Sequence, residues 1–145
     1  MKYLLSSVMI LFTCSTSLAA ELTPGNIVGR YNVEARAGFQ KVYLKFRVLN
    51  TREFEIQRTY PDGHSDESCN GTFTLNPTLY WDFVTFGSGK IFSGVATCPS
   101  NRSKELDFNI DFKETTTEDL VRGTNVTVTT SLARGIRINA YVKKQ

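Results

Sequence analysis

The sequence predicts an all-β domain, an antiparallel meander of about eight or nine strands that forms a closed or nearly closed barrel. Apolar and polar residues alternate with a period of two along most of the chain, and helical periodicity is nearly absent. Turn signals recur roughly every ten to twelve residues. A two-sheet β-sandwich is the alternative architecture. We favour a barrel because closure removes the unpaired strand edges that a meander otherwise exposes.

Residues 1–20 have the pattern of a signal peptide rather than of a folded segment. A positively charged start and a short apolar run precede Ser17-Leu18-Ala19, which offers small residues to a signal peptidase. Cleavage after Ala19 and cleavage after Ala20 both fit this pattern. The sequence therefore predicts a periplasmic or secreted protein. Acylation of Cys14, as in a bacterial lipoprotein, is the alternative fate of the leader.

Residues 21–145 are predicted to form a single domain, long enough to bury a real hydrophobic core. The whole chain has 17 basic and 14 acidic residues. Removal of the leader takes away Lys2 and no acid, which leaves 16 basic residues against 14 acidic ones. A balance this close to neutral implies no particular class of partner.

The first part of the domain is predicted to contain three strands, at residues 27–36, 41–48 and 53–60. Gly38 interrupts the alternation after the first strand, and Asn50-Thr51 marks a tight turn before the third. The second strand has a wholly apolar inward face and a largely basic outward face. This pattern is typical of a barrel wall with one buried side.

The segment from Cys69 to Cys98 contains a dense set of aromatic residues. We interpret it as three strands broken at Asn76-Pro77 and at Gly87-Ser88-Gly89. Cys69 and Cys98 share an inward parity and are expected to form a disulfide in an oxidising compartment. Closing a loop of about 30 residues removes unfolded-chain entropy worth ~3–4 kcal/mol in the simple model, so we predict a structural role for this bridge.

The last part of the domain is predicted to contain a strand, a short helix and two further strands. Thr115 and Glu118 have the spacing of a capping box, and Gly123 is placed to end a helical turn. The predicted ranges are 105–112 for the strand, 116–122 for the helix, and 124–132 and 135–143 for the final strands.

Gly29-Arg30-Tyr31 in the first predicted strand resembles the G-x-W sequence that opens lipocalin-type barrels. The number of strands also agrees loosely with that family. Tyrosine stands where the family pattern has tryptophan, and an extra short helix is predicted before the last two strands. The resemblance implies a small secreted barrel that binds a ligand in its interior.

The sequence favours a binding protein without a cofactor over an enzyme. Its single histidine, His64, lies in a polar loop beside Ser65 and Asp66, but adjacent residues do not make a catalytic triad, and nothing supplies an oxyanion site. The acids of this loop, residues 62–67, lack the full EF-hand pattern, so we expect a solvated loop rather than a metal site. Motifs for nucleic-acid binding are missing, which argues against such a partner.

Basic residues concentrate near the two ends of the predicted domain, whereas acids concentrate at 62–67 and 105–119. In a closed barrel the first and last strands pair, so the basic residues are expected to share an outer face. Such a face attracts anionic lipids, anionic glycans or an acidic protein, and peripheral membrane contact follows from it. A solvated face that keeps the protein soluble is the alternative. The residues of this face are Arg30, Arg36, Lys41, Lys45, Arg47 and Arg137.

The expected function is retention of a small apolar or anionic amphipathic ligand. Arg58 shares its parity with apolar neighbours, and a buried unpaired charge is too costly to persist. It should therefore lie at the barrel rim, pair with Asp82 or meet an anionic group of the ligand. The alternative function is an envelope or secreted protein-interaction module with a packed core, such as an enzyme inhibitor. The candidate ligand-binding residues are Tyr31, Phe54, Arg58, Tyr60 and Trp81.

Overall fold

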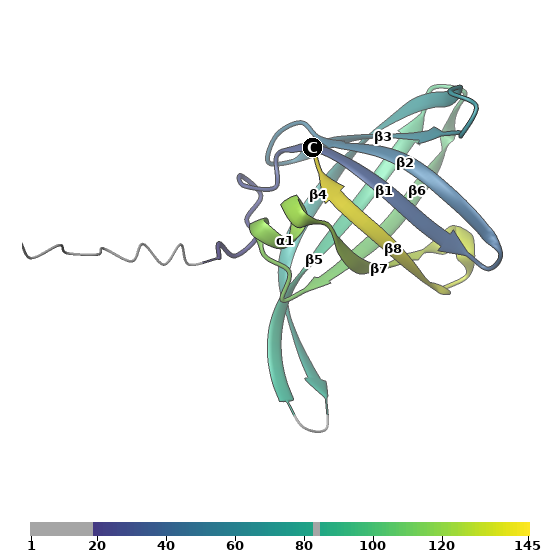
Figure 1. Ribbon diagram of the computed structural model, residues 1–145. Helices are drawn as coiled ribbons and strands as arrows, with labels where there is room; N and C mark the ends of the chain where they lie inside the picture. Colours follow the sequence, from purple (N-terminus) through teal and green to yellow (C-terminus); the bar gives the residue numbers. More distant parts are fainter. Residues whose placement is uncertain (1–18, 83–84) are drawn as a thin grey trace, which may run out of the picture.

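The computed structural model describes residues 19–82 and 85–145, which fold into a closed barrel of eight antiparallel strands (Figure 1). The strands follow one another around the barrel in sequence order, and the last pairs with the first. The predicted closed meander is confirmed, and the sandwich alternative is wrong. The predicted leader up to residue 18, including Cys14, lies outside the described residues. The strands are β1 (Gly29–Ala37), β2 (Gln40–Val48), β3 (Glu53–Thr59), β4 (Ser65–Asp82), β5 (Thr85–Cys98), β6 (Asn101–Lys113), β7 (Thr124–Thr130) and β8 (Arg137–Lys144).

The alternation of residue types explains how the barrel closes. Tyr31 of β1 lies opposite Phe46 of β2 on one side and opposite Lys144 of β8 on the other. Every second residue of each strand points inward, so the apolar set of each strand meets the apolar sets of its neighbours. A slip of one residue in either pairing exchanges the two faces, so the buried interior fixes the register.

The segment between the two cysteines forms two long strands, and not the predicted three. β4 continues through Asn76-Pro77, and β5 continues through Gly87-Ser88-Gly89. The outer parts of both strands project beyond the barrel as a hairpin (Figure 1). Pro77 pairs there with Lys90 of β5, while the pairing of β3 with β4 ends before this point. Proline is tolerated because this part of β4 has a neighbour on one side alone.

Gly87 and Gly89 mark close approaches of other groups rather than a turn. A Cβ atom at Gly87 would lie 2.6 Å from Cε2 of Tyr80. A Cβ atom at Gly89 would lie 2.6 Å from the carbonyl carbon of Lys113 in β6. Both positions need a residue without a side chain, which is why the predicted strand break at these glycines is wrong.

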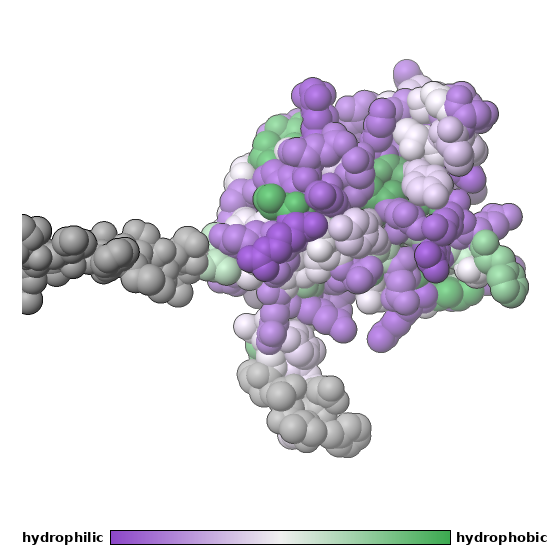
Figure 2. Space-filling view, viewed as in Figure 1, coloured by the Kyte–Doolittle hydropathy of each residue, from purple (hydrophilic) through white to green (hydrophobic). Residues whose placement is uncertain are grey.

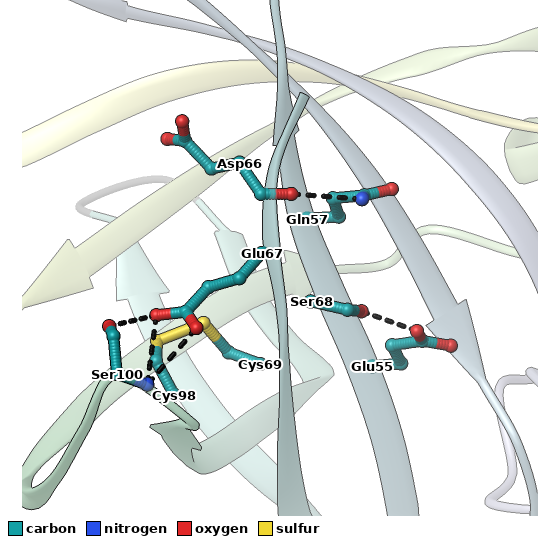
Figure 3. The surroundings of a disulfide bond; sticks show 8 residues. All are labelled: Glu55, Gln57, Asp66, Glu67, Ser68, Cys69, Cys98 and Ser100. Carbon is teal, nitrogen blue, oxygen red and sulfur yellow. Dashed lines mark hydrogen bonds between the residues drawn. A yellow bond between two sulfur atoms is a disulfide. The ribbon is translucent and has the colours of Figure 1, made fainter. Parts of the chain in front are cut away.

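Cys69 and Cys98 form the predicted disulfide, with their Cα atoms 4.2 Å apart on β4 and β5 (Figure 3). The carboxylate of Glu67 accepts a hydrogen bond from the backbone N–H of Ser100 at 3.0 Å and another from its hydroxyl. The bridge and these bonds together fasten the start of β4 to the turn between β5 and β6.

Aromatic rings fill one half of the barrel. Phe54 and Phe92 are fully buried, with ring centroids 5.7 Å apart. Phe73 stacks on Phe92 at 4.4 Å, and Phe108 meets Phe54 edge to face at 5.4 Å. Such tilted and edge-on contacts contribute beyond the burial of area alone.

Two inward-facing glycines make room for these rings. A Cβ atom at Gly71 would lie 2.6 Å from Cζ of Phe54. A Cβ atom at Gly94 would lie 2.9 Å from Cζ of Phe108 and 2.9 Å from Cε1 of Phe92. The close packing of the aromatic half therefore depends on the absence of side chains on the facing strands.

The N-terminal segment and helix α1 (Thr117–Arg122) cover one end of the barrel. Leu22, Ile27 and Leu120 are buried at this end. The backbone N–H of Thr117 donates to the carbonyl of Ala20 at 3.1 Å, which holds the two segments together. The turns β1–β2, β3–β4, β5–β6 and β7–β8 surround the opposite end.

The short helix is present as predicted, but its capping box lies one residue later than Thr115 and Glu118. The amide N–H of Thr116 donates to the Asp119 carboxylate at 2.9 Å, and the Asp119 N–H donates back to the Thr116 hydroxyl oxygen at 3.3 Å. The following strand is shorter than predicted, because a single 3-10 turn, η1 (Ser131–Ala133), begins at residue 131. Within the described ranges, each helix is too short to reach across a bilayer.

Candidate ligand-binding cavity

The half of the barrel that the phenylalanine rings leave free contains a cavity of about 320 Å³. Ile27 and Leu120, which line its closed end, are buried, whereas Ala37 and Leu132 at the other end are exposed. The cavity therefore opens at the end that the β1–β2 and β7–β8 turns surround. Its wall between the two ends includes Val33, Ala35, Val42, Leu44, Leu106, Phe108, Val128 and Ile138.

Small side chains on two neighbouring strands account for the empty space. Ala35 of β1 lies opposite Ala140 of β8, and both line the cavity. Methyl groups on this wall do not reach the far side, whereas the opposite wall carries the phenylalanine rings. The volume lies at the lower end of the usual range for small-molecule sites, about 300–1,000 Å³.

The cavity wall is apolar. Among the described lining residues, Tyr31 and Thr130 alone carry side-chain hydroxyls, and both donate to backbone carbonyls, Tyr31 to Ile27 and Thr130 to Asp107 at 2.8 Å. Burial raises the pKa of Tyr31 to about 12, so its phenol stays neutral even in moderately alkaline solution. The described wall therefore offers a ligand dispersion contacts and removal from water, and it presents no nucleophile or acid–base pair.

The structure does not bring the five predicted ligand-binding residues together. Tyr31 lines the cavity, and Phe54 lies in the aromatic core beside it. Arg58 and Tyr60 lie at the rim outside the cavity, and Trp81 is 82% exposed on the projecting hairpin. Tyr31 is thus the one member of this set whose position fits a ligand-lining role.

Arg58 lies at the rim because the strand is irregular at this point. The β3–β4 register shifts between Gln57 and Thr59, and the Arg58 side chain is exposed. Its guanidinium carbon lies 4.7 Å from the centroid of the Tyr60 ring. Of the three positions predicted for Arg58, the structure thus has the one at the barrel rim. The side chain of Asp82, the proposed partner, lies outside the described residues.

The acidic segment at residues 60–67, which comprises the turn between β3 and β4 and the first residues of β4, is organised by contacts among its own residues. The Tyr60 ring stacks on His64 with centroids 4.1 Å apart, and the Tyr60 hydroxyl donates to Asp66 at 3.0 Å. Nδ1 of His64 lies 2.5 Å from a carboxylate oxygen of Asp62. In the part of the chain that the structure describes, no three His, Cys, Asp or Glu side chains form a group that could hold a metal ion.

Most of the cavity wall consists of residues that we did not select from the sequence. Leu44, Leu106 and Ile138 have an inward parity on their strands, and the small alanines at residues 35 and 37 share it. That combination of parity and size is the signal that could have found them. Leu132 could not have been found in this way, because it belongs to η1 and not to a strand.

The predicted basic residues share one outer wall because β8, β1 and β2 are neighbours. Arg30 lies directly opposite Arg47, and Arg36 lies directly opposite Lys41. Glu34 offsets part of this charge, with carboxylate contacts to Lys41 at 3.0 Å and to Arg36 at 3.9 Å. Like charges at opposite positions are destabilising, so this wall favours an anionic neighbour. The basic wall consists of Arg30, Arg36, Lys41, Lys45, Arg47 and Arg137, all of them exposed.

Fold and cavity together define a small closed β-barrel with an apolar internal space and a basic outer wall. No protein-family model matches the chain, and no curated protein or solved structure matches it either.

Proposed function

We propose that this protein is an exported, non-catalytic binding protein that holds a small apolar or amphipathic ligand inside a lipocalin-like barrel. The observation that carries the proposal is the cavity of about 320 Å³ with its apolar wall. Water fills such a space poorly, because a buried water needs two to four polar partners. A ligand that occupies the space gains the dispersion contacts that an empty wall lacks.

The polarity of the cavity defines the ligand class. The apolar part of the ligand lies inside, and a polar group, if there is one, lies at the open end. Arg36 and Lys41 stand at that end, at the β1–β2 turn, and favour an anionic group there. An acyl chain with a carboxylate or phosphate head has this distribution of polarity.

Export and the lipocalin-like assignment rest on separate observations. Residues 1–20 have the pattern of a signal peptide, and the Cys69–Cys98 disulfide is of a kind that persists in oxidising compartments. The lipocalin-like assignment is supported by the eight-stranded meander and by Gly29-Arg30-Tyr31 at the start of β1.

Titration with a fluorescent apolar probe, N-phenyl-1-naphthylamine, tests the proposal. Ala35→Phe places a ring in the cavity, and we expect it to weaken probe binding about tenfold or more. Asn139→Phe, on the outer surface of β8, is the matched control and should bind the probe as the wild type does. Equal binding by all three proteins, or no binding by the wild type, contradicts the proposal.

A second candidate function, a protein-interaction module such as an enzyme inhibitor, is favoured by the projecting hairpin. Leu79 and Trp81 on its β4 strand are 68% and 82% exposed. Exposed apolar side chains of this size are typical of surfaces that bind a partner. A wild type that binds no probe, together with loss of a purified partner on Leu79→Ser/Trp81→Ser, would favour this function instead.

A further inference from the structure

Exposed apolar side chains gather on one side of the open end of the barrel. Phe39 in the β1–β2 turn is fully exposed, and Leu132 and Ile136 in the β7–β8 connection are 55% and 64% exposed. Arg36 pairs with Asn139 near these turns, so the β1–β2 turn and the start of β8 lie side by side (Figure 1). Figure 2 shows hydrophobic surface at this end, bordered by hydrophilic surface. We call Phe39, Leu132 and Ile136 the apolar rim.

Cations surround the apolar rim. Arg36 and Lys41 flank the β1–β2 turn. Arg134 lies in the β7–β8 connection, and Arg137 begins β8. All four side chains are exposed. Glu34 is shared between Lys41 and Arg36 and neutralises one of these charges. The other acids of the open end lie at residues 62–67 and on β6 at Glu105 and Asp107, and the Asp107 carboxylate accepts a hydrogen bond from the hydroxyl of Ser131, beside Leu132. Around the apolar rim the four cations exceed the nearby acids Glu34 and Asp107, so this side of the open end carries a net positive charge.

From this arrangement we propose that the open end of the barrel docks on a lipid surface with anionic headgroups, with the β1–β2 and β7–β8 turns foremost. Apolar side chains enter the boundary between headgroups and acyl chains, while neighbouring cations stay among the anionic headgroups. The acidic segment at residues 60–67 is repelled by the same surface, so the barrel docks in a tilted orientation.

Docking in this orientation turns the cavity mouth toward the bilayer. Leu132 belongs to the apolar rim and also lines the cavity, so the docked surface and the cavity wall are continuous. An apolar ligand can then pass between bilayer and cavity without crossing water. Docking itself does not require a ligand, whereas the transfer of a ligand between bilayer and cavity rests on the proposed function.

Co-sedimentation with vesicles of equal parts phosphatidylglycerol and phosphatidylcholine tests the docking surface. Phe39→Ser/Ile136→Ser should weaken binding about tenfold or more, because two exposed apolar anchors are lost. Leu79→Ser/Trp81→Ser removes two exposed apolar residues from the hairpin at the other end and should bind as the wild type does. Equal binding by the rim variant and the wild type overturns the proposal, and so does a loss confined to the hairpin variant.

The charge of the surface is tested separately. Arg134→Glu/Arg137→Glu should weaken binding to the same vesicles about tenfold or more, since each basic residue near an anionic surface contributes several-fold. Vesicles of phosphatidylcholine alone should bind the wild type weakly. Equal binding to neutral and anionic vesicles overturns the choice of an anionic surface.

Tryptophan fluorescence reports which end meets the bilayer. Trp81 is the only tryptophan of the chain and lies on the hairpin, so its emission should stay unchanged when vesicles are added. A Phe39→Trp/Trp81→Phe variant should show a blue shift with anionic vesicles. The opposite result places the hairpin in the bilayer and overturns the proposal. No ligand or probe is used, so failure here is distinguishable from failure of the cavity to bind.

A second inference concerns the N-terminal segment and rests on different contacts. The backbone nitrogen of Ala20 donates to the Glu118 carboxylate at 3.2 Å, and the Ala20 carbonyl accepts from the Thr117 N–H at 3.1 Å. Glu21 forms a β-bridge with Thr116. The chain is thus held against α1 from Ala20 onward, while Ala19 is exposed.

The contacts of Ala20 point to the processing site, and we propose that a signal peptidase hydrolyses the Ala19–Ala20 bond. Water supplies the hydroxyl for the new carboxylate of Ala19, and Ala20 leaves with a free amine that takes up a proton at neutral pH. The new ammonium then lies beside the Glu118 carboxylate, so an amide hydrogen bond becomes an ion pair. Cleavage after Ala20 would instead remove the hydrogen bonds that Ala20 makes with Thr117 and Glu118.

Intact-mass measurement of the exported protein tests the cleavage position. The expected mass begins at Ala20; a chain that begins at Glu21, or an uncleaved chain, overturns the inference. Glu118→Gln should lower the melting temperature at pH 7 relative to Glu105→Gln, an exposed control acid on β6. The difference should shrink as pH rises well above about 8, where an α-amine loses its proton. A difference that persists unchanged at high pH contradicts the ion pair.

Discussion

The side chain of Lys144 lies over the ring of Tyr31, with Nζ 5.7 Å from the ring centroid. Lys144 ends β8 and Tyr31 is near the start of β1, so the contact spans the seam where the barrel closes. Nζ also donates to the carbonyl of Asn26 at 3.1 Å. The cation–π contact and the hydrogen bond together stabilise closure, and the space beside Gly29 accommodates the lysine stem. Gly29-Arg30-Tyr31 thus has a structural role in this chain.

Gly29→Ala should destabilise the protein by about 1–3 kcal/mol. Gly29 has a φ of 150°, which side chains rarely allow, and an added Cβ would lie 2.6 Å from Cε of Lys144. Gly25→Ala is the control, because a Cβ there meets nothing within 4 Å. Urea denaturation should give a lower midpoint for Gly29→Ala alone. Equal midpoints for the two variants contradict the role assigned to Gly29.

Replacing Cys69 and Cys98 together by alanine should cost about 2–5 kcal/mol of the free energy of unfolding, because the bridge closes a loop in the unfolded chain. The wild type should gain roughly 2 Da on reduction, the two hydrogens of one bridge. Intact-mass analysis and denaturation curves measure both effects. Two free thiols in the exported protein would count against the bridge.

Asp119→Asn should destabilise α1 at neutral pH but not in strong acid. Hydrogen bonds from the Thr116 amide and hydroxyl hold the pKa of Asp119 below its usual value. A group with a lowered folded-state pKa contributes stability above the usual aspartate pKa, and this contribution is lost as pH falls through the lowered value. Melting temperatures of the wild type and the variant should therefore differ at pH 7 and converge at low pH. A difference in melting temperature that stays constant with pH would mean that the charge of Asp119 plays no part in the helix cap.

The fold could be predicted from alternation because each strand has one buried face. The strand breaks predicted at Pro77 and Gly89 were wrong, because residues distant in the sequence determine the structure at both positions. Pro77 is tolerated because β3 no longer pairs with β4 there, and Gly89 is needed because the Lys113 backbone passes close to it. A turn and a close approach both favour glycine, and one sequence does not distinguish them.

The candidate site was harder to predict than the fold. The alternation along the strand predicts an inward side chain for Arg58. The irregular pairing of β3 with β4 instead leaves this side chain exposed at the rim. Trp81 falls in the second of the three strands predicted between the cysteines, whereas β4 extends past the barrel and places Trp81 outside it. The basic wall, by contrast, could be predicted, because closure alone makes β1, β2 and β8 neighbours.

Native mass spectrometry of the protein purified from its own source tests the central claim most directly. We expect the wild type to carry a small apolar or amphipathic molecule that is released on denaturation and extracted into organic solvent. Ala35→Phe, purified in the same way, should carry none, while Asn139→Phe should retain it. A wild type that carries no such molecule, or an Ala35→Phe variant that retains it equally, would contradict binding inside the barrel.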